Sequence, residues 1–179
     1  MSESIQFMPE LFPAFKKDDI CKMVSATSQR ISSDYQNRQL ILIGVLNGAF
    51  VFLSDLVRNL KIPVQIDFIG VSSYGDGTSS SGAIHLTKEI GLDLQGKDVL
   101  VVEDIVDTGL TISYITNYIK KSDPESVKIC TFLDKNERRE TEIEIDYACF
   151  VVDKGFFVGY GLDYANDYRN LPDLYYLKL

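Results

Sequence analysis

Basic residues and histidine are scarce in this chain of 179 residues. Eighteen lysines and arginines stand against 26 aspartates and glutamates, so the formal net charge is -8 and the pI is about 4.6. A nucleic-acid surface needs a basic face to neutralise phosphates, and the composition therefore argues against nucleic-acid partners. His85 is the only histidine. A histidine-centred nucleophilic triad and a metal site of several histidines are accordingly not expected.

Cysteines and long apolar runs are also few. Cys21, Cys130 and Cys149 are odd in number, far apart and not spaced like metal ligands, which favours buried, reduced thiols. No stretch approaches the roughly 20 apolar residues that span a bilayer. The start, MSESIQFMPE, lacks the basic and apolar regions of a signal peptide. We therefore expect a cytoplasmic protein with no membrane contact.

What is present is an alternation of helical and strand-like patterns. A hydrophobic content of 45% can build a substantial core, and the length suits one domain, residues 1–179. Helices are predicted at 17–31, 49–60 and 110–121, and strands at 40–46, 64–72, 99–102 and 127–133. This order predicts an α/β fold with a parallel central sheet flanked by helices. Shorter strands, expected at 148–152, 156–160 and 174–177, would form a small C-terminal cap over that sheet.

The most informative segment is 98–112, DVLVVEDIVDTGLTI. Its run of β-branched residues, Val99 to Val102, predicts a strand buried on both faces. Glu103 and Asp104 follow at the carboxyl end of that strand, where ligands bind in open α/β sheets. Two adjacent carboxylates there can accept hydrogen bonds from a vicinal diol such as ribose.

The turn that follows these acids suits a phosphate. Gly109 permits a tight turn and close backbone approach, and Thr108 and Thr111 add hydroxyls to the free amides of a helix that begins near Leu110. Together with the acids, the turn describes a pocket for a sugar phosphate. The alternative is an acidic loop that only caps the helix, because Asp and Thr are common helix caps.

An acidic protein that binds a diphosphate has to offset long-range repulsion. Divalent cations and a few placed basic residues can do so locally, so magnesium (Mg2+) is expected. A second strand-to-helix turn, Leu46-Asn47-Gly48, offers backbone amides for another anionic group. A polar, glycine-rich loop begins at Ser73-Tyr74, and it is either a disordered surface loop or a moving segment.

Segment 98–112 resembles the phosphoribosyl-pyrophosphate signature of type I phosphoribosyltransferases. From about Leu40 onward, four separated motifs resemble, in order, the hypoxanthine-guanine phosphoribosyltransferases of the compact bacterial type. The resemblance implies the type I phosphoribosyltransferase fold, with a core at about 35–150 and a small hood formed by the N-terminal segment and about 150–179. It also implies purine salvage: phosphoribose passes from phosphoribosyl pyrophosphate to N9 of hypoxanthine or guanine, giving IMP or GMP and pyrophosphate.

The same resemblance assigns roles on the phosphoribosyl side. Asp107 is the candidate acid/base near N7 of the purine, Glu103 and Asp104 hold the ribose hydroxyls and metal, and Thr108, Gly109 and Thr111 anchor the 5-phosphate. In purine members of the family the turn that matches 46–48 binds pyrophosphate, usually contains a basic residue where Asn47 stands, and often has a cis peptide. Because Asn47 is uncharged, a charged side-chain contact with pyrophosphate is in doubt at this position. The main chain of Leu46, Asn47 and Gly48 can still bind pyrophosphate.

Roles on the purine side follow in the same way. The stretch LDKNERRE resembles the one whose lysine recognises the 6-oxo group, which assigns that role to Lys135 and disfavours adenine. In 156–164, Phe156 would stack on the purine, Phe157 would contact its edge through the main chain, and Asp163 would help to bind the metal. Arg169 would contact pyrophosphate, and Ser73 and Tyr74 would belong to a lid that excludes water. Without the resemblance, two alternatives remain: Lys135 is a solvated surface lysine, and the aromatic residues of 156–164 only pack in the core.

Two rival functions use similar features. A regulator on the same fold would bind nucleotides or RNA without catalysis, and a phosphatase or phosphoacceptor domain would also place aspartates at strand ends beside magnesium. The acidity and the purine motifs count against the first, and the second would need an aspartyl phosphate. Family resemblance suggests a homodimer or homotetramer, while the choice among hypoxanthine, guanine and xanthine stays open.

Overall fold

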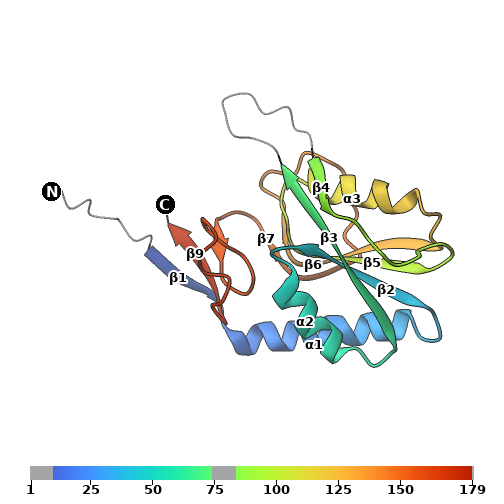
Figure 1. Cartoon of the computed structure of the whole chain (residues 1–179). Coiled ribbons are helices and arrows are strands. Elements are labelled where there is room, and N and C mark those ends of the chain that lie inside the picture. The colour runs from blue at the N-terminus through green and yellow to red at the C-terminus, as the bar shows by residue number, and fades with distance from the viewer. Residues whose placement is uncertain (1–9, 74–83, 179) are drawn as a thin grey trace.

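The computed structural model describes residues 10–73 and 84–178, which form two sheets and three helices (Figure 1). The helices are α1 (Lys17–Asp34), α2 (Phe50–Asn59) and α3 (Leu110–Lys120). The strands are β1 (Glu10–Phe15), β2 (Leu40–Leu46), β3 (Val64–Ser73), β4 (Ile84–Lys88), β5 (Asp98–Val106), β6 (Ser126–Lys135), β7 (Tyr147–Val152), β8 (Phe157–Val158) and β9 (Leu174–Lys178).

The larger sheet has the order β4-β3-β2-β5-β6-β7. All neighbours pair in parallel except β4, which lies antiparallel to β3 at one edge. Strands β2 and β5 occupy the middle and are buried over nearly their whole lengths, as their unbroken apolar runs predict. The predicted α/β fold with a mostly parallel central sheet is confirmed.

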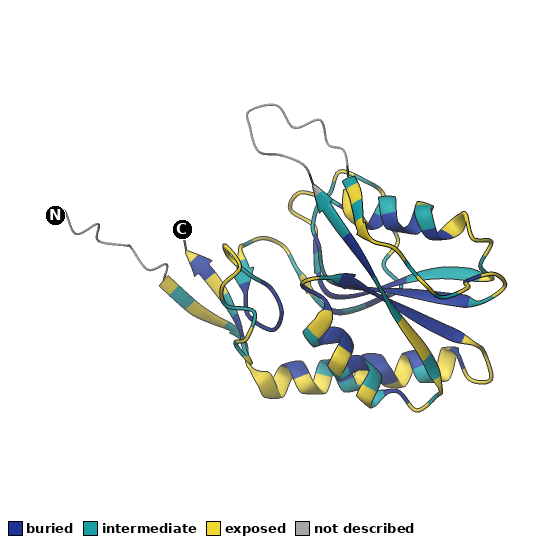
Figure 2. Ribbon diagram, in the orientation of Figure 1, coloured by how far each residue is buried: buried dark blue, intermediate teal, exposed yellow. Residues whose placement is uncertain are grey.

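Helices cover both faces of this sheet (Figure 2). Along β2, Leu40 and Leu42 pack with α1 and α2 in one core cluster, whereas Ile41 and Ile43 pack with α3 in the other. Side chains of a strand alternate between its two faces, so consecutive apolar residues can supply both clusters. The sequence pattern of β2 therefore accounts for a sheet enclosed by helices on two sides.

A smaller sheet, which we call the hood, has the order β1-β9-β8. Strand β1 pairs antiparallel with β9 from Glu10↔Lys178 onward, and Phe157 of β8 lies opposite Tyr176 of β9. Strand β1 was not predicted from the sequence, and neither was β4. Half of β1 is exposed and it contains a proline, so its apolar pattern is weak.

One strand was assigned to the wrong sheet. The expected strand at 148–152 corresponds to β7, which pairs in parallel with β6 and forms an edge of the central sheet instead of the C-terminal cap. Its alternating burial resembles that of any half-covered strand, so its sequence does not reveal which sheet it joins. The expected strands at 156–160 and 174–177 do lie in the hood, although β8 is only two residues long. Among the described helices, none combines the length and apolar character needed to cross a membrane.

Asp67 ties β3 to the loop that follows β4. Its Oδ1 accepts hydrogen bonds from Lys88 Nζ at 2.9 Å and from the Phe68 amide at 2.7 Å, and its Oδ2 accepts the Gly91 amide at 2.6 Å. Burial acts to raise the pKa of Asp67, but these donors together with the Leu92 amide outweigh it and lower the pKa from 3.8 to about 2. The carboxylate is therefore stabilised by the folded state.

This shift predicts a pH-dependent contribution to stability. Because the folded pKa of Asp67 is below its unfolded value, the contribution is complete above pH 4 and is lost as the pH falls through about 2. Asp67→Asn should lower the free energy of unfolding at pH 7 by about 2 kcal/mol. Urea denaturation at pH 7 and pH 3 measures it, with the exposed neighbour Glu89→Gln as control. An equal loss at both pH values would contradict the electrostatic explanation.

Candidate active site

The paired acids lie near the carboxyl end of β5, which is longer than the predicted strand at 99–102 and runs to Val106. Glu103 is 7% exposed, and its Oε1 accepts the Asp104 amide at 3.0 Å. Burial and the adjacent charge of Asp104 raise the pKa of Glu103 well above its ordinary value. Burial also raises the pKa of Asp104, although a hydrogen bond with Glu103 and the charge of Arg169 act in the opposite direction.

The turn after β5 leads directly into α3. Gly109 has φ 85° and ψ -9°, a left-handed conformation that favours glycine, and α3 begins at Leu110 as predicted. The Leu110 amide donates to Thr108 Oγ1 at 3.3 Å. A pocket of about 110 Å3 opens here, lined by Glu103, Ile105, Val106, Asp107, Thr108, Gly109, Thr111 and Ile112. The predicted phosphate residues Thr108, Gly109 and Thr111 thus share one small pocket with Asp107 and Glu103.

The turn at 46–48 lies beside the acids. The peptide between Leu46 and Asn47 is cis, as the family resemblance implies. A Cβ atom on Gly48 would overlap the carboxylate of Asp104, and a Cβ atom on Gly161 would overlap the main-chain oxygen of Gly48. The main chain of Gly48 therefore lies directly between the Asp104 side chain at the end of β5 and the main chain of Gly161 after β8.

Arg169 and Asp163 complete that corner. Arg169 Nη2 pairs with Asp163 Oδ1 at 2.7 Å, and Arg169 Nη1 donates to the main-chain oxygen of Gly161 at 2.7 Å. Asp163 Oδ2 also accepts the Asn166 amide at 2.8 Å. Both side chains are about three-quarters buried. The structure thus brings the predicted pyrophosphate residues Gly48 and Arg169 to the side of Asp104.

Lys135 reaches the acid/base candidate from the end of β6. Its side chain is 5% exposed, and its Nζ lies 3.2 Å from Asp107 Oδ2 and 3.5 Å from Glu137 Oε2. Asp107 Oδ1 is buried and has no hydrogen-bond partner within the described part of the chain. A buried carboxylate oxygen without a donor is costly, so a ligand that supplies an N–H at this point would be stabilised.

Phe156, the residue predicted to stack on the purine, follows a segment that contacts the neighbourhood of Lys135. Phe156 is 39% exposed and packs edge to face against Tyr164, with ring centroids 5.7 Å apart. The Gly155 amide lies 3.4 Å from Glu137 Oε2, which links this segment to the neighbourhood of Lys135. Phe157 packs its ring on Tyr176, 6.0 Å between centroids. Of the predicted lid, Ser73 ends β3 and Tyr74 lies outside the described residues.

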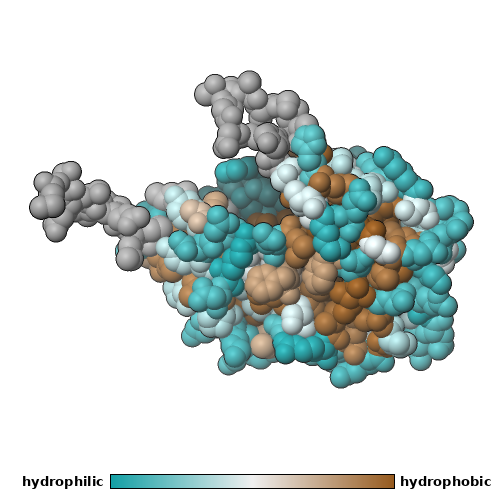
Figure 3. Space-filling model, in the orientation of Figure 1, coloured by the Kyte–Doolittle hydropathy of each residue, from teal (hydrophilic) through white to brown (hydrophobic). Residues whose placement is uncertain are grey.

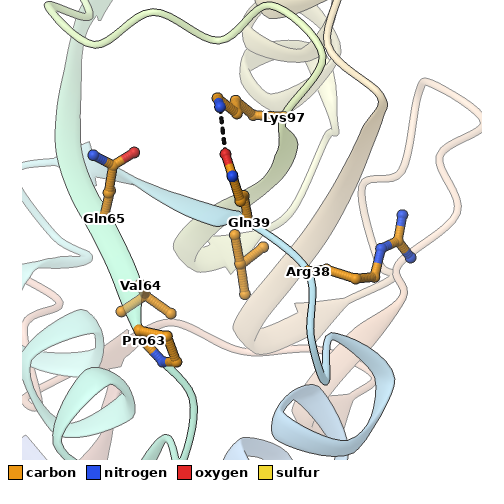
Figure 4. Close-up of a pocket in the computed structure, with 7 residues that line it drawn as sticks. Arg38, Gln39, Pro63, Val64, Gln65 and Lys97 are labelled. Carbon is orange, nitrogen blue, oxygen red and sulfur yellow. Dashed lines mark hydrogen bonds between the residues drawn. The ribbon is translucent and has the colours of Figure 1, made fainter.

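A larger pocket, of about 350 Å3, lies elsewhere (Figure 4). It is lined by residues at the amino ends of β2, β3 and β5, among them Arg38, Gln39, Gln65 and Lys97. Lys97 donates a hydrogen bond to Gln39, and Arg38 pairs with the buried Asp98 at 2.5 Å. Ligands of parallel sheets bind at the carboxyl ends of strands. We therefore place the site at Glu103 and Asp107 despite the smaller pocket there.

A model of the phosphoribosyl transferase domain matches residues 16–165 of the chain. The chain belongs to the phosphoribosyltransferase family. The hypoxanthine-guanine phosphoribosyltransferase of Streptococcus pneumoniae is 43% identical over 161 residues, which cover 90% of this chain and 89% of that protein. The crystal structure of a hypoxanthine phosphoribosyltransferase from Staphylococcus aureus superposes with a TM-score of 0.89 at 38% identity, covering 93% of this chain and 91% of that one.

The bifunctional protein TilS/HprT of Listeria monocytogenes is 44% identical over 162 residues. That match covers 90% of this chain but only 25% of the bifunctional protein, so the chain spans a quarter of the length of these relatives. The phosphoribosyltransferase described here thus resembles both stand-alone proteins and one part of a longer one.

Some residues of the site were not predicted from the sequence. Glu137 pairs with Lys135, and Gly161 lies close to the main chain of Gly48. Arg139 bonds to the loop that contains Asp107. Glu137 and Arg139 lie within the LDKNERRE stretch, where several charged side chains look alike in sequence. For Gly161, the only feature of the sequence that indicated close approach of two main-chain segments was the repeated glycine in Gly159-Tyr160-Gly161.

The contact between Gly48 and Asp104 yields a test. Gly48→Ala should displace the Asp104 carboxylate, because a Cβ atom would overlap it. We expect kcat/KM for the phosphoribosyl donor to fall at least tenfold and stability to fall by about 1–3 kcal/mol, the usual cost of overpacking. Steady-state kinetics and thermal unfolding measure both. Gly96→Ala is the control, since a Cβ there has no atom within 4 Å, and it should affect stability only, through its positive φ. Unchanged donor kinetics for Gly48→Ala would contradict the contact.

Proposed function

We propose that this phosphoribosyltransferase transfers phosphoribose from phosphoribosyl pyrophosphate to N9 of hypoxanthine or guanine, giving IMP or GMP and pyrophosphate. The observation that carries the proposal is the pair of the buried Lys135 and the partly buried Asp107 beside the pocket at Thr108–Thr111. A cation that can donate to an exocyclic oxygen thus lies next to a carboxylate with a free oxygen and a phosphate-sized pocket. The names of the relatives agree with this reaction.

The phosphoribosyl donor would be held on the α3 side. The free amides at the start of α3, the hydroxyls of Thr108 and Thr111 and the backbone of Gly109 suit the 5-phosphate. Glu103 and Asp104 would accept hydrogen bonds from the ribose hydroxyls. The backbone at Leu46–Gly48 and the guanidinium of Arg169 would contact the pyrophosphate. Anchoring the 5-phosphate fixes C1 of the ribose relative to the base, which supplies rate through positioning.

Magnesium fits the donor set of this site. Glu103 and Asp104 are hard oxygen ligands with raised pKa values, and neither pairs with a lysine or arginine among the described residues. No group of three or more candidate ligands is present within residues 10–73 and 84–178. Magnesium is usually held by one or two protein carboxylates, with water and substrate oxygens completing its coordination shell. When bound, magnesium would neutralise charge on the leaving pyrophosphate. Asp163 would contribute only after it releases Arg169.

The chemical step breaks the bond between C1 and pyrophosphate and forms a bond between C1 and N9. The ribose gains oxocarbenium character as pyrophosphate leaves, and Arg169 would stabilise the developing charge of the leaving group. Asp107 would take or share the proton at N7 of the purine through its free Oδ1. Lys135 would donate to the 6-oxo group, Phe156 would stack on the ring, and the Phe157 main chain would contact its edge. Ser73 and Tyr74 would exclude water as part of a lid.

A direct assay tests the proposal. Purified protein is incubated with phosphoribosyl pyrophosphate, magnesium and one of four purines: hypoxanthine, guanine, xanthine or adenine. We expect IMP and GMP with stoichiometric pyrophosphate, and little AMP. Omission of magnesium with added chelator should abolish product. Absence of nucleotide from any purine, together with a gel shift on RNA, would instead indicate a regulator on this fold.

We also propose a cytoplasmic homodimer or homotetramer. Apolar side chains gather on the face shown in Figure 3, over β3 and α2. Among the exposed large hydrophobic residues, Ile66 lies in β3 and is 42% exposed, and Phe50 begins α2. Contiguous exposed apolar surface is typical of association surfaces. Sedimentation equilibrium measures the state, and a monomer at micromolar concentration would contradict this proposal.

A further inference from the structure

Arg139 lies between the two segments that carry the proposed chemistry. Its Nε donates to the main-chain oxygen of Asp107 at 2.9 Å, and its Nη2 lies 3.1 Å from the main-chain oxygen of Val106. The same Nη2 lies 3.1 Å from the main-chain oxygen of Lys135 and 2.5 Å from Asp134 Oδ1. One guanidinium therefore bonds to the loop after β5 and to the end of β6.

The charge of Arg139 is already matched within the protein. Its side chain is 18% exposed, that of its partner Asp134 is 16% exposed, and the two form an ion pair. An arginine that binds phosphate commonly uses two parallel N–H groups in a bidentate contact. Arg139 instead uses Nε and Nη2 on protein oxygens, so its contacts favour a role in holding backbone over a role in binding substrate.

Main-chain bonds from the same turn strengthen this connection. The amides of Glu140 and Thr141 donate to the main-chain oxygen of Thr108 at 2.9 and 3.2 Å. The Arg139 side chain also approaches Gly109, where a Cβ atom would lie 3.3 Å from its Cδ. Residues 139–141 thus bond to the main chain of Asp107 and Thr108 and lie close to Gly109.

We propose that Arg139 is a positioning residue that sets the spacing between Asp107 and Lys135 in the transferase reaction. The inference rests on the proposed function, because it concerns the geometry of that reaction. Both residues bond to Arg139 through their main chains, while their side chains meet at 3.2 Å. The rigid, planar guanidinium of Arg139 therefore fixes the positions of both Asp107, the acid/base candidate, and Lys135, the candidate for base recognition.

Arg139→Lys is the informative variant. Lysine keeps the charge next to Asp134, but a single ammonium cannot reproduce the planar fork that bonds to both segments. Misplacement of reacting groups by 1 Å can reduce rate by about 100-fold. We expect kcat for IMP formation to fall about 100-fold. The KM for phosphoribosyl pyrophosphate should rise less than kcat falls, because the main-chain bonds from the Glu140 and Thr141 amides to Thr108 remain in the variant.

The experiment compares Arg139→Lys, Asp134→Asn and Arg138→Lys with the unaltered protein below their melting temperatures. Arg138 is the exposed neighbour and serves as the matched control. Asp134→Asn removes the ion pair but leaves the main-chain bonds of Arg139, so we expect a smaller loss of kcat than for Arg139→Lys. The ratio of kcat/KM for hypoxanthine to that for adenine is measured for each variant, and should fall in Arg139→Lys.

Two results would overturn the inference. One is an Arg139→Lys variant with kcat and purine preference equal to those of Arg138→Lys. The other is a proportional loss of all activities that matches the fraction of unfolded protein, which a purely structural role predicts. If the unaltered protein itself forms no nucleotide from any purine, the proposed function fails, and that outcome is distinct from both.

Discussion

Asp107→Asn should reduce kcat for IMP formation by about 100- to 10,000-fold, the range that a positioned general acid or base contributes. Asparagine has the same shape but cannot take a proton. Oδ2 of Asp107 faces Lys135, and Oδ1 is buried without a donor among the described residues, so in the proposed reaction this free oxygen would receive a proton from the purine. Binding of phosphoribosyl pyrophosphate should change little, because its anchors are amides and hydroxyls.

Calorimetric titration of phosphoribosyl pyrophosphate measures binding, and single-turnover kinetics measures chemistry apart from product release. The exposed Asp93→Asn is the control, and it should match the unaltered protein in both. Unchanged turnover in Asp107→Asn would remove Asp107 from the acid/base role. If the only loss is weaker binding of phosphoribosyl pyrophosphate, Asp107 binds that substrate instead of acting on the purine.

Lys135→Ala should change which purine is used. The Lys135 ammonium is buried and donates to Asp107, so it can also donate to a 6-oxo group but not to the amino group of adenine. Hydrogen bonds that involve a charged group contribute about 1.5–3 kcal/mol. We therefore expect the ratio of kcat/KM for hypoxanthine to that for adenine to fall by roughly 10- to 100-fold.

Lys135→Met accompanies this variant because methionine retains most of the buried volume. Loss of Lys135 leaves Asp107 without its cation, so thermal unfolding has to be measured alongside the kinetics. Lys154→Met is an exposed control from the segment that precedes Phe156. If the preference for 6-oxopurines survives in both Lys135 variants, the assignment of base recognition to Lys135 is wrong.

Local features of the site could be predicted from the sequence. The segment from Val99 to Thr111 encodes its own strand, turn and helix start, because each depends on residues within a few positions of one another. Contacts between distant segments could not be predicted. Nothing in the local pattern indicates that Arg139 would bond to the Asp107 loop, or that Gly161 would touch Gly48.

The assignment of β7 failed for a related reason. A short run of alternating burial specifies a strand but not its partner, and partners are chosen by packing of the whole chain. The same limit explains why β1 was missed, since its only strand partner, β9, lies at the far end of the described residues. The family resemblance added the N-terminal segment to the hood, whereas the strand pattern alone predicted only a C-terminal cap.

The pairing of β1 with β9 also has a consequence for the order in which the protein matures on the ribosome. Strand β1 is synthesised long before β9, so its edge stays unpaired until β9 emerges from the ribosome. The pocket between β5 and α3 needs only residues made earlier, whereas Phe157 gains its partner Tyr176 only when β9 emerges. We expect nascent chains to form the pocket at Thr108–Thr111 before Phe157 is packed in the hood.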